Sequence, residues 1–126
     1  MVNNISCGVD IAKATSECFK IPLFCKIVNT KEMVIQARYV DNNGDMMQRA
    51  INLENTNRLL WTGIGCLGGK TGCNSRGGES LVACYEGRVL VVILGALGRE
   101  QKFMDCEKLI GWLREKLDAE RVAKNN

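Results

Sequence analysis

Apolar residues along the chain recur with two different spacings, and the clearest pattern is near the C-terminal end. There the three-four spacing predicts a helix over residues 99–122 with one apolar stripe, formed by Phe103, Cys106, Ile110, Leu113 and Leu117. Charged residues are the commonest type on the other face, as on a helix face that meets water. We therefore expect one side of this helix to pack against the rest of the domain.

Two apolar segments before this helix predict a pair of strands. They cover residues 80–85 and 88–94 and are joined at Glu86-Gly87, a turn signal. The second segment is apolar without alternation, through Val89, Leu90, Val91, Val92, Ile93 and Leu94. A strand of this composition has both faces covered, so we interpret it as a central strand.

The N-terminal part predicts two short helices. Asp10 can cap a helix over residues 11–19, because an aspartate side chain accepts hydrogen bonds from the first free N–H groups of a helix. Pro22 ends this helix, since proline cannot donate to an earlier carbonyl. Residues 23–28 follow as a short second helical segment.

A β-hairpin is predicted between these helices and the middle of the chain. Residues 31–39 have strand character, and residues 46–53 can return as the second strand. The intervening Asn43-Gly44 can supply the positive φ that a tight turn needs.

The most glycine-dense stretch, residues 65–78, places Lys70 and Thr71 side by side. Gly69-Lys70-Thr71 matches the second half of a phosphate-binding P-loop, but the position that needs the first glycine holds Ile64. A P-loop also opens a helix, whereas more glycine and an apolar strand-like segment follow here. A P-loop is therefore disfavoured.

The other interpretation is a Lys-Thr-Gly triplet on a strand, as in serine penicillin-recognising enzymes. In that arrangement the lysine offers a cation to the substrate carboxylate and the threonine hydroxyl donates a hydrogen bond to it. The glycine, Gly72, lets the ligand lie against the strand edge because it has no Cβ.

Composition narrows the possible partners. The 126 residues suit one domain, and a net charge of +3, with 17 basic and 14 acidic residues dispersed along the chain, gives no reason to expect nucleic acid or a membrane surface. No apolar run reaches the length of a membrane span. The N-terminus lacks the order of a signal peptide, so a reducing intracellular compartment is favoured.

Seven cysteines are present and there is no histidine. The count is odd and no Cys-x-x-Cys pair occurs, so neither a zinc site nor a disulfide framework is indicated. We expect no metal and no cofactor, and interpret the cysteines as reduced, mostly buried thiols.

The order of these elements resembles the later part of D-alanyl-D-alanine carboxypeptidases, the low-molecular-weight penicillin-binding proteins of the S11 peptidase family. The resemblance covers residues 9–113, and its matching runs are Leu23–Glu32, Asn55–Leu60, Gly68–Gly72, Gly78 with Leu81–Ala83, Val91–Gly95 and the helix with Phe103, Asp105 and Trp112. It implies an α+β fold, a partial β-lactamase/DD-carboxypeptidase-like αβα sandwich with an antiparallel sheet. Residues 1–126 would form the C-terminal portion of such a domain, without its first strands and nucleophile segment.

The same resemblance assigns a substrate-binding role to four residues. Lys70 and Thr71 would bind a terminal carboxylate beside Gly72, and the backbone N–H of Cys73 would be one oxyanion donor. The family's nucleophile motif Ser-x-x-Lys and its Ser-x-Asn motif do not occur in the sequence. No catalytic residue is therefore assigned.

In the family the first strand, which precedes the nucleophile, pairs with the final strand, whose counterpart is residues 89–94. That strand would have an open apolar edge here, which predicts a protein partner. We favour a non-catalytic structural subunit docked in a larger assembly. The alternatives are one half of a split serine carboxypeptidase, completed by a partner with Ser-x-x-Lys and Ser-x-Asn, and a free-standing binding domain.

Overall fold

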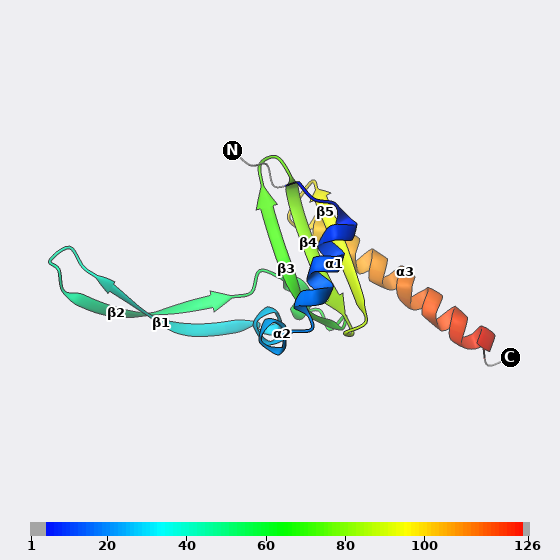
Figure 1. Ribbon diagram of the computed structural model, residues 1–126, viewed down its shortest axis with the longest axis horizontal. Coiled ribbons are helices and arrows are strands. Elements are labelled where there is room, and N and C mark those ends of the chain that lie inside the picture. The colour runs from blue at the N-terminus through cyan, green and yellow to red at the C-terminus, as the bar shows by residue number, and fades with distance from the viewer. Residues whose placement is uncertain (1–4, 125–126) are drawn as a thin grey trace.

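The computed structural model describes residues 5–124, which form helices and antiparallel strands (Figure 1). This α+β architecture confirms the predicted fold class. The elements in chain order are α1 (Gly8–Cys18), α2 (Pro22–Asn29), β1 (Glu32–Val40), β2 (Met46–Glu54), the 3-10 helix η1 (Arg58–Leu60), β3 (Cys66–Asn74), β4 (Gly78–Tyr85), β5 (Val89–Ala96) and α3 (Gln101–Lys124).

The main sheet has three strands in the order β3-β4-β5, all antiparallel. β4 and β5 are joined at Glu86 and Gly87, which both have positive φ, so the predicted turn is confirmed. The interpretation of residues 88–94 as a central strand is wrong, because β5 is an edge strand and pairs only with β4 within residues 5–124. Its apolar composition reflects helices over its faces rather than strands on both sides.

Both faces of β4 are buried. Leu81, Ala83 and Tyr85 belong to a core cluster that also contains residues of α3. Val82 and Cys84 alternate with them and so point to the opposite face, where they too are buried. On that side α1 lies against β5 and α2 against β3 (Figure 1).

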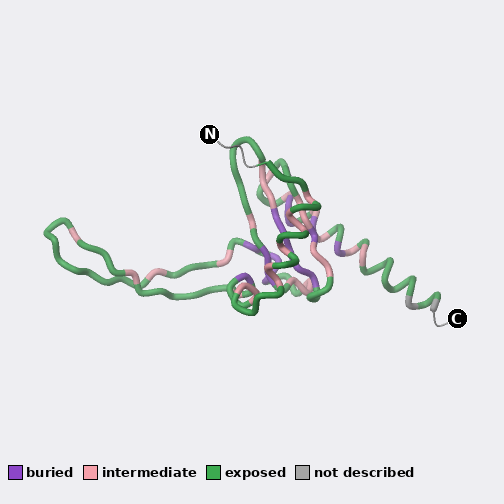
Figure 2. Tube along the Cα trace, viewed as in Figure 1, coloured by how far each residue is buried: buried purple, intermediate pink, exposed green. Residues whose placement is uncertain are grey.

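α3 covers the sheet only with its first half. Phe103, Cys106 and Ile110 are buried in the core, Leu113 is half-buried, and Leu117 is exposed. The helix therefore has the predicted apolar stripe, but it continues beyond the sheet into solvent (Figures 1 and 2). No helix in residues 5–124 combines the length and the apolar character that crossing a membrane would require.

The N-terminal helices differ in detail from the prediction. α1 begins at Gly8 with Cys7 as its N-cap, and no side chain caps it. The assignment of Asp10 as the cap is therefore wrong. Asp10 lies in the first turn, where its carboxylate is favourable near the positive end of the helix dipole and accepts a hydrogen bond from the Cys7 thiol at 3.4 Å. Pro22 begins α2, a position that proline favours.

The predicted hairpin is confirmed and is the most extended part of the molecule. β1 and β2 pair from Glu32–Glu54 to Val40–Met46, and Gly44 has a φ of +89° in the turn. The hairpin projects from the three-stranded sheet and is exposed along most of its length (Figures 1 and 2).

All seven cysteines are free thiols, but most of them are not buried. Only Cys84 and Cys106 are buried, so the expectation of mostly buried thiols is wrong. Of the others, Cys66 and Cys73 lie on the edge strand β3, and Cys7, Cys18 and Cys25 lie on or beside the N-terminal helices, where cover is incomplete. Burial raises the pKa of Cys84 and raises that of Cys106 to about 12.

Candidate functional site

The Lys-Thr-Gly triplet lies within β3, which runs from Cys66 to Asn74. Because the strand continues past Thr71, no helix opens there and the P-loop interpretation is excluded. β3 is the edge strand opposite β5, and within the described part of the chain its outer edge has no partner. The triplet therefore lies where a ligand can approach backbone and side chains together.

Glycines on β3 have two different roles. The pairing with β4 shifts register between Cys66 and Gly69. A Cβ added to Gly69 would lie 1.9 Å from the Val82 carbonyl oxygen, and one on Gly68 would lie 2.6 Å from Cγ2 of Val28. A Cβ on Gly72 would meet only Ser80 Cβ, at 4.0 Å. The glycines before Lys70 are thus required by packing, whereas Gly72 is not.

All four predicted binding residues line one open pocket beside β3. Its lining consists of Thr56, Lys70, Thr71, Gly72, Cys73, Glu79, Arg99 and Lys102. The hydroxyl oxygens of Thr56 and Thr71 lie 2.6 Å apart and share a hydrogen bond. Lys70 is exposed, and its ammonium donates to the Thr71 carbonyl oxygen.

A nearly buried ion pair forms one wall of this pocket. The Lys102 side chain is 4% exposed and donates to the carboxylate of Glu79. This contact holds the pKa of Glu79 below its usual range, and a hydrogen bond from the Cys73 thiol lowers it further. The same hydrogen bond to Glu79 raises the pKa of Cys73, because it favours the protonated thiol. Cys73 is therefore not activated as a nucleophile.

The charges in the pocket favour an anionic ligand. Lys102 is neutralised by Glu79. Lys70 and Arg99 make no ion pair among the described residues, and the hydroxyl of Thr71 lies in the same pocket. Cations beside a hydroxyl donor can bind a carboxylate through charge-assisted hydrogen bonds.

The structure separates the predicted residues into two groups. Lys70, Thr71, Gly72 and Cys73 line the β3 pocket. The six residues of β5, Val89 to Leu94, lie at the other edge of the sheet with β4 between. The two groups of residues therefore do not form one site.

Sequence reasoning missed four residues of the pocket, namely Thr56, Glu79, Arg99 and Lys102. Glu79 pairs with Cys73 across the sheet, so the register of the β3–β4 hairpin could have found it. Lys102 and Arg99 come from around the start of α3, which no local pattern places against β3.

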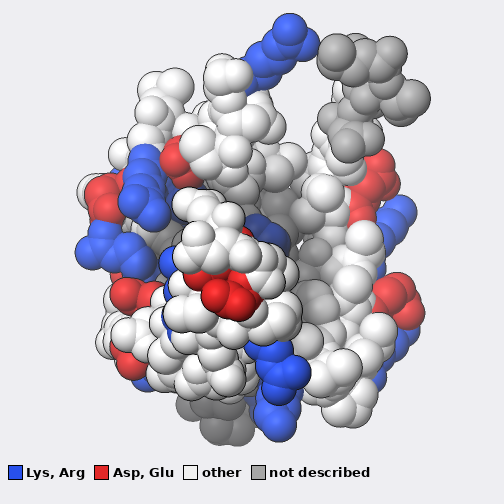
Figure 3. Space-filling model, turned by 90° about the vertical axis from the view of Figure 1, so that its left-hand side faces the viewer, with Lys and Arg blue, Asp and Glu red and all other residues white. Residues whose placement is uncertain are grey.

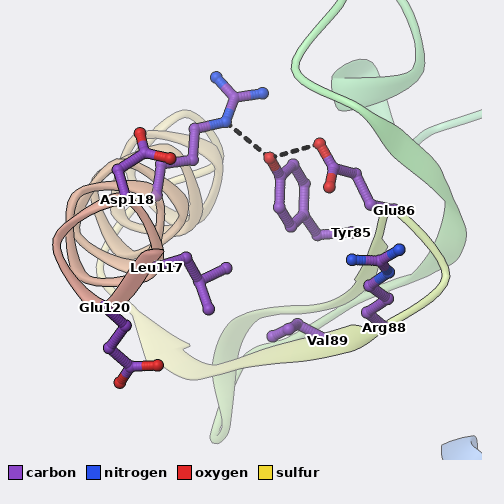
Figure 4. Close-up of a pocket in the computed structure, with 8 residues that line it drawn as sticks. Tyr85, Glu86, Arg88, Val89, Leu117, Asp118 and Glu120 are labelled. Atoms are coloured by element: carbon purple, nitrogen blue, oxygen red, sulfur yellow. Dashed lines mark hydrogen bonds between the residues drawn. The ribbon is translucent and has the colours of Figure 1, made fainter. Parts of the chain in front are cut away.

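A second pocket, between the β4–β5 turn and α3, has internally paired polar groups (Figure 4). The Tyr85 hydroxyl donates to Glu86 at 2.7 Å and accepts from Arg114 Nε at 2.7 Å, and Arg114 also donates to the Ile64 carbonyl at 2.8 Å. The hydrogen bond with Tyr85 raises the pKa of Arg114. These hydrogen bonds connect α3 to the end of β4 and the β4–β5 turn.

Comparison with known proteins identifies the fold. No protein-family model and no curated protein sequence matches the chain. A structure of the Streptomyces K15 DD-transpeptidase matches with a TM-score of 0.61 and 24% identity over 82% of this chain. Two mutants of that enzyme match with TM-scores of 0.63, at 24% identity over 82% of the chain and 23% over 86%.

The chain spans only 40–42% of the length of these structures. At this identity the likeness shows the fold alone, and the narrower carboxypeptidase family stays a prediction. The chain thus has, in part, the α+β fold of penicillin-binding, β-lactamase-like proteins.

Proposed function

We propose that this chain is a non-catalytic, DD-carboxypeptidase-like subunit that docks in a larger protein assembly through the free edge of β5. The observation that carries the proposal is the position of β5, an apolar strand at the sheet edge with no second partner in residues 5–124. The unpaired backbone groups of such an edge can hydrogen-bond to an added strand. Residues 1–126 would then be the C-terminal portion of a DD-carboxypeptidase-like domain.

The non-catalytic role rests on the missing chemistry of acyl transfer. Neither Ser-x-x-Lys nor Ser-x-Asn occurs in the 126 residues. Glu79 raises the pKa of Cys73, the thiol in the β3 pocket, which disfavours its thiolate. The pocket thus offers groups that bind but no activated nucleophile.

The test is isolation of the assembly from source cells that express tagged variants of the chain. Leu94→Lys places a charge on the β5 edge, where Leu94 is 47% exposed. Met104→Lys is the matched control, because Met104 is 50% exposed but lies on α3. We expect Leu94→Lys to lose the stoichiometric partners that wild type and Met104→Lys retain. Equal co-purification by all three would refute docking through β5.

A second candidate function is the binding half of a split serine carboxypeptidase. The β3 pocket favours it, because Lys70 and Thr71 line one pocket with Gly72, at which the fold itself does not require glycine. A partner chain would then supply Ser-x-x-Lys and Ser-x-Asn.

A fluorescent β-lactam distinguishes the two candidates. In the split enzyme it labels a serine of the partner, and Lys70→Ala reduces the labelling while the exposed Lys108→Ala does not. An assembly without such a partner, and without labelling, supports the structural role. A stable, soluble monomer in the source cells would instead favour a free-standing binding domain.

A further inference from the structure

The β1–β2 hairpin has one strongly apolar face. Because side chains alternate along a strand, cross-strand pairs two residues apart share a face. The pairs on this face are Met33–Leu53, Ile35–Ile51, Ala37–Arg49 and Tyr39–Met47. The opposite face is more polar: six of its ten residues are Glu32, Gln36, Arg38, Gln48, Asn52 and Glu54, and the other four are Val34, Val40, Met46 and Ala50. We call the first set the ribbon face.

Much of the ribbon face is exposed. Met33, Tyr39 and Leu53 retain 52%, 45% and 47% of their accessible surface. The hairpin extends away from the sheet (Figures 1 and 2), and Figure 3 views the molecule from this end. A lone two-stranded hairpin is marginally stable in water, so a covering element would stabilise it.

The apolar surface continues from the hairpin onto α2. Leu23 and Ile27, one helical turn apart, are 65% and 61% exposed. With Met33 and Leu53 they line a groove at the root of the hairpin, which Lys26, Thr30, Lys31, Glu32, Glu54 and Asn55 also border. The groove and the ribbon face thus form one elongated surface.

Dimensions and charge indicate what this surface binds. A nine-residue strand is about 30 Å long and two strands with their side chains are about 10 Å wide, which are also the length and width of a helix of about 20 residues. Arg49, which lies over the Tyr39 ring at 5.6 Å, is the one charged residue of the ribbon face. A second copy of the chain would bring two Arg49 side chains into one small interface, whereas an acidic residue would pair with Arg49.

We propose that the ribbon face and the α2 groove bind an amphipathic helix of a partner protein, with apolar residues at three-four spacing and an acidic residue facing Arg49. This mode is helix-in-groove recognition, in which the apolar stripe provides the binding energy and flanking charge sets the register. The inference does not depend on the free edge of β5.

The test uses the full chain and three fluorescent synthetic helical peptides of about 20 residues. One has a leucine stripe flanked by glutamate, the second has the same stripe flanked by lysine, and the third has the glutamate composition with a scrambled stripe. Fluorescence anisotropy gives each Kd. We expect the glutamate peptide to bind at least about tenfold more tightly than the scrambled one.

Variants on the two faces of β1 give matched controls. Ile35→Lys, on the ribbon face, should weaken the glutamate peptide at least about tenfold, because it places a charge in an apolar contact. Val34→Lys changes the neighbouring residue on the other face and should bind as wild type does. Arg49→Glu should reverse the preference toward the lysine peptide, and it keeps the proposal testable if Ile35→Lys does not fold.

Several outcomes would overturn the proposal. The proposal fails if the wild type binds the glutamate and scrambled peptides equally well. It also fails if Ile35→Lys and Val34→Lys lose the same affinity for the glutamate peptide, or if Arg49→Glu still prefers that peptide over the lysine peptide. A wild-type dimer that Ile35→Lys converts to a monomer in sedimentation would assign the surface to a second copy. Binding to phosphatidylglycerol vesicles that Ile35→Lys abolishes, without peptide binding, would assign it to a membrane surface.

Discussion

Replacement of Gly69 by alanine should destabilise the protein strongly, because the glycine lies against the backbone of β4. The new Cβ would lie 1.9 Å from the Val82 carbonyl oxygen, whereas real Cβ atoms essentially never come closer than 3.0 Å. Relief therefore requires a shift of about 1 Å between paired strands. Overpacking of this kind costs about 1–3 kcal/mol, and each lost backbone hydrogen bond adds about 1 kcal/mol. With two such hydrogen bonds lost, we expect a total loss of about 3–5 kcal/mol.

Gly72 on the same strand is the matched control. A Cβ there would have only Ser80 Cβ nearby, at 4.0 Å, and Gly72 is not among the glycines with positive φ. Alanine at this position should leave the free energy of unfolding within about 0.5 kcal/mol. It could raise it by up to about 1 kcal/mol, because alanine lowers the conformational entropy of the unfolded chain. It would nevertheless add a methyl group to the β3 pocket.

Urea titration followed by tryptophan fluorescence measures both effects, since the chain contains Trp61 and Trp112. With a slope of about 1.5 kcal/mol/M, a loss of 3 kcal/mol lowers the urea midpoint by about 2 M. Equal midpoints for Gly69→Ala and Gly72→Ala would refute the argument that packing, rather than ligand approach, requires the first of these glycines.

Three further predictions follow from the core and the pocket. Ile110→Ala, at a site 1% exposed, should cost about 2–5 kcal/mol in urea unfolding, while Leu109→Ala, 44% exposed, should cost less than about 1 kcal/mol. Because the pKa of Glu79 is lowered, its pairing with Lys102 stabilises the fold fully above the unfolded pKa of about 4.5, and this stabilisation is lost as the pH falls through the folded pKa. The difference in stability between wild type and Glu79→Gln should therefore shrink from about pH 5 to pH 3. Glu79→Gln should also speed alkylation of Cys73 by iodoacetamide at about pH 8, because the carboxylate that keeps the thiol protonated is removed, and an unchanged rate by mass spectrometry would contradict this.

Local patterns in the sequence predicted the elements well. The turn signals Asn43-Gly44 and Glu86-Gly87 predicted the β1–β2 and β4–β5 hairpins, because Gly44 and Gly87 supply positive φ in these turns. The stripe on α3 identified its packed face through Phe103, Cys106 and Ile110, but it did not show where packing ends, because it also included Leu117, which is exposed. These signals depend on residues close together in the chain, which is why they could be interpreted without a structure.

Features set by distant contacts were not predictable in the same way. An apolar strand such as β5 has the same composition whether strands or helices cover it, so composition alone wrongly indicated a central strand, and only the family resemblance predicted its open edge. The ion pair of Glu79 with Lys102 joins β4 to α3, and nothing near Lys102 in the sequence indicates that its ammonium is buried. The four residues of β3 for which binding is predicted share one pocket because they form a contiguous motif, whereas the other lining residues come from three other parts of the chain.

The two apolar surfaces that the described residues leave uncovered call for different kinds of contact. The β5 edge would be satisfied by backbone hydrogen bonds from an added strand, whereas the ribbon face would be covered by the side chains of a helix. A double-mutant cycle with Leu94→Lys and Ile35→Lys distinguishes one partner from two. If separate partners bind, each variant should release its own partner and the effects should add. If a single protein covers both surfaces, either variant should weaken its retention, and the double variant should show coupling between the two sites.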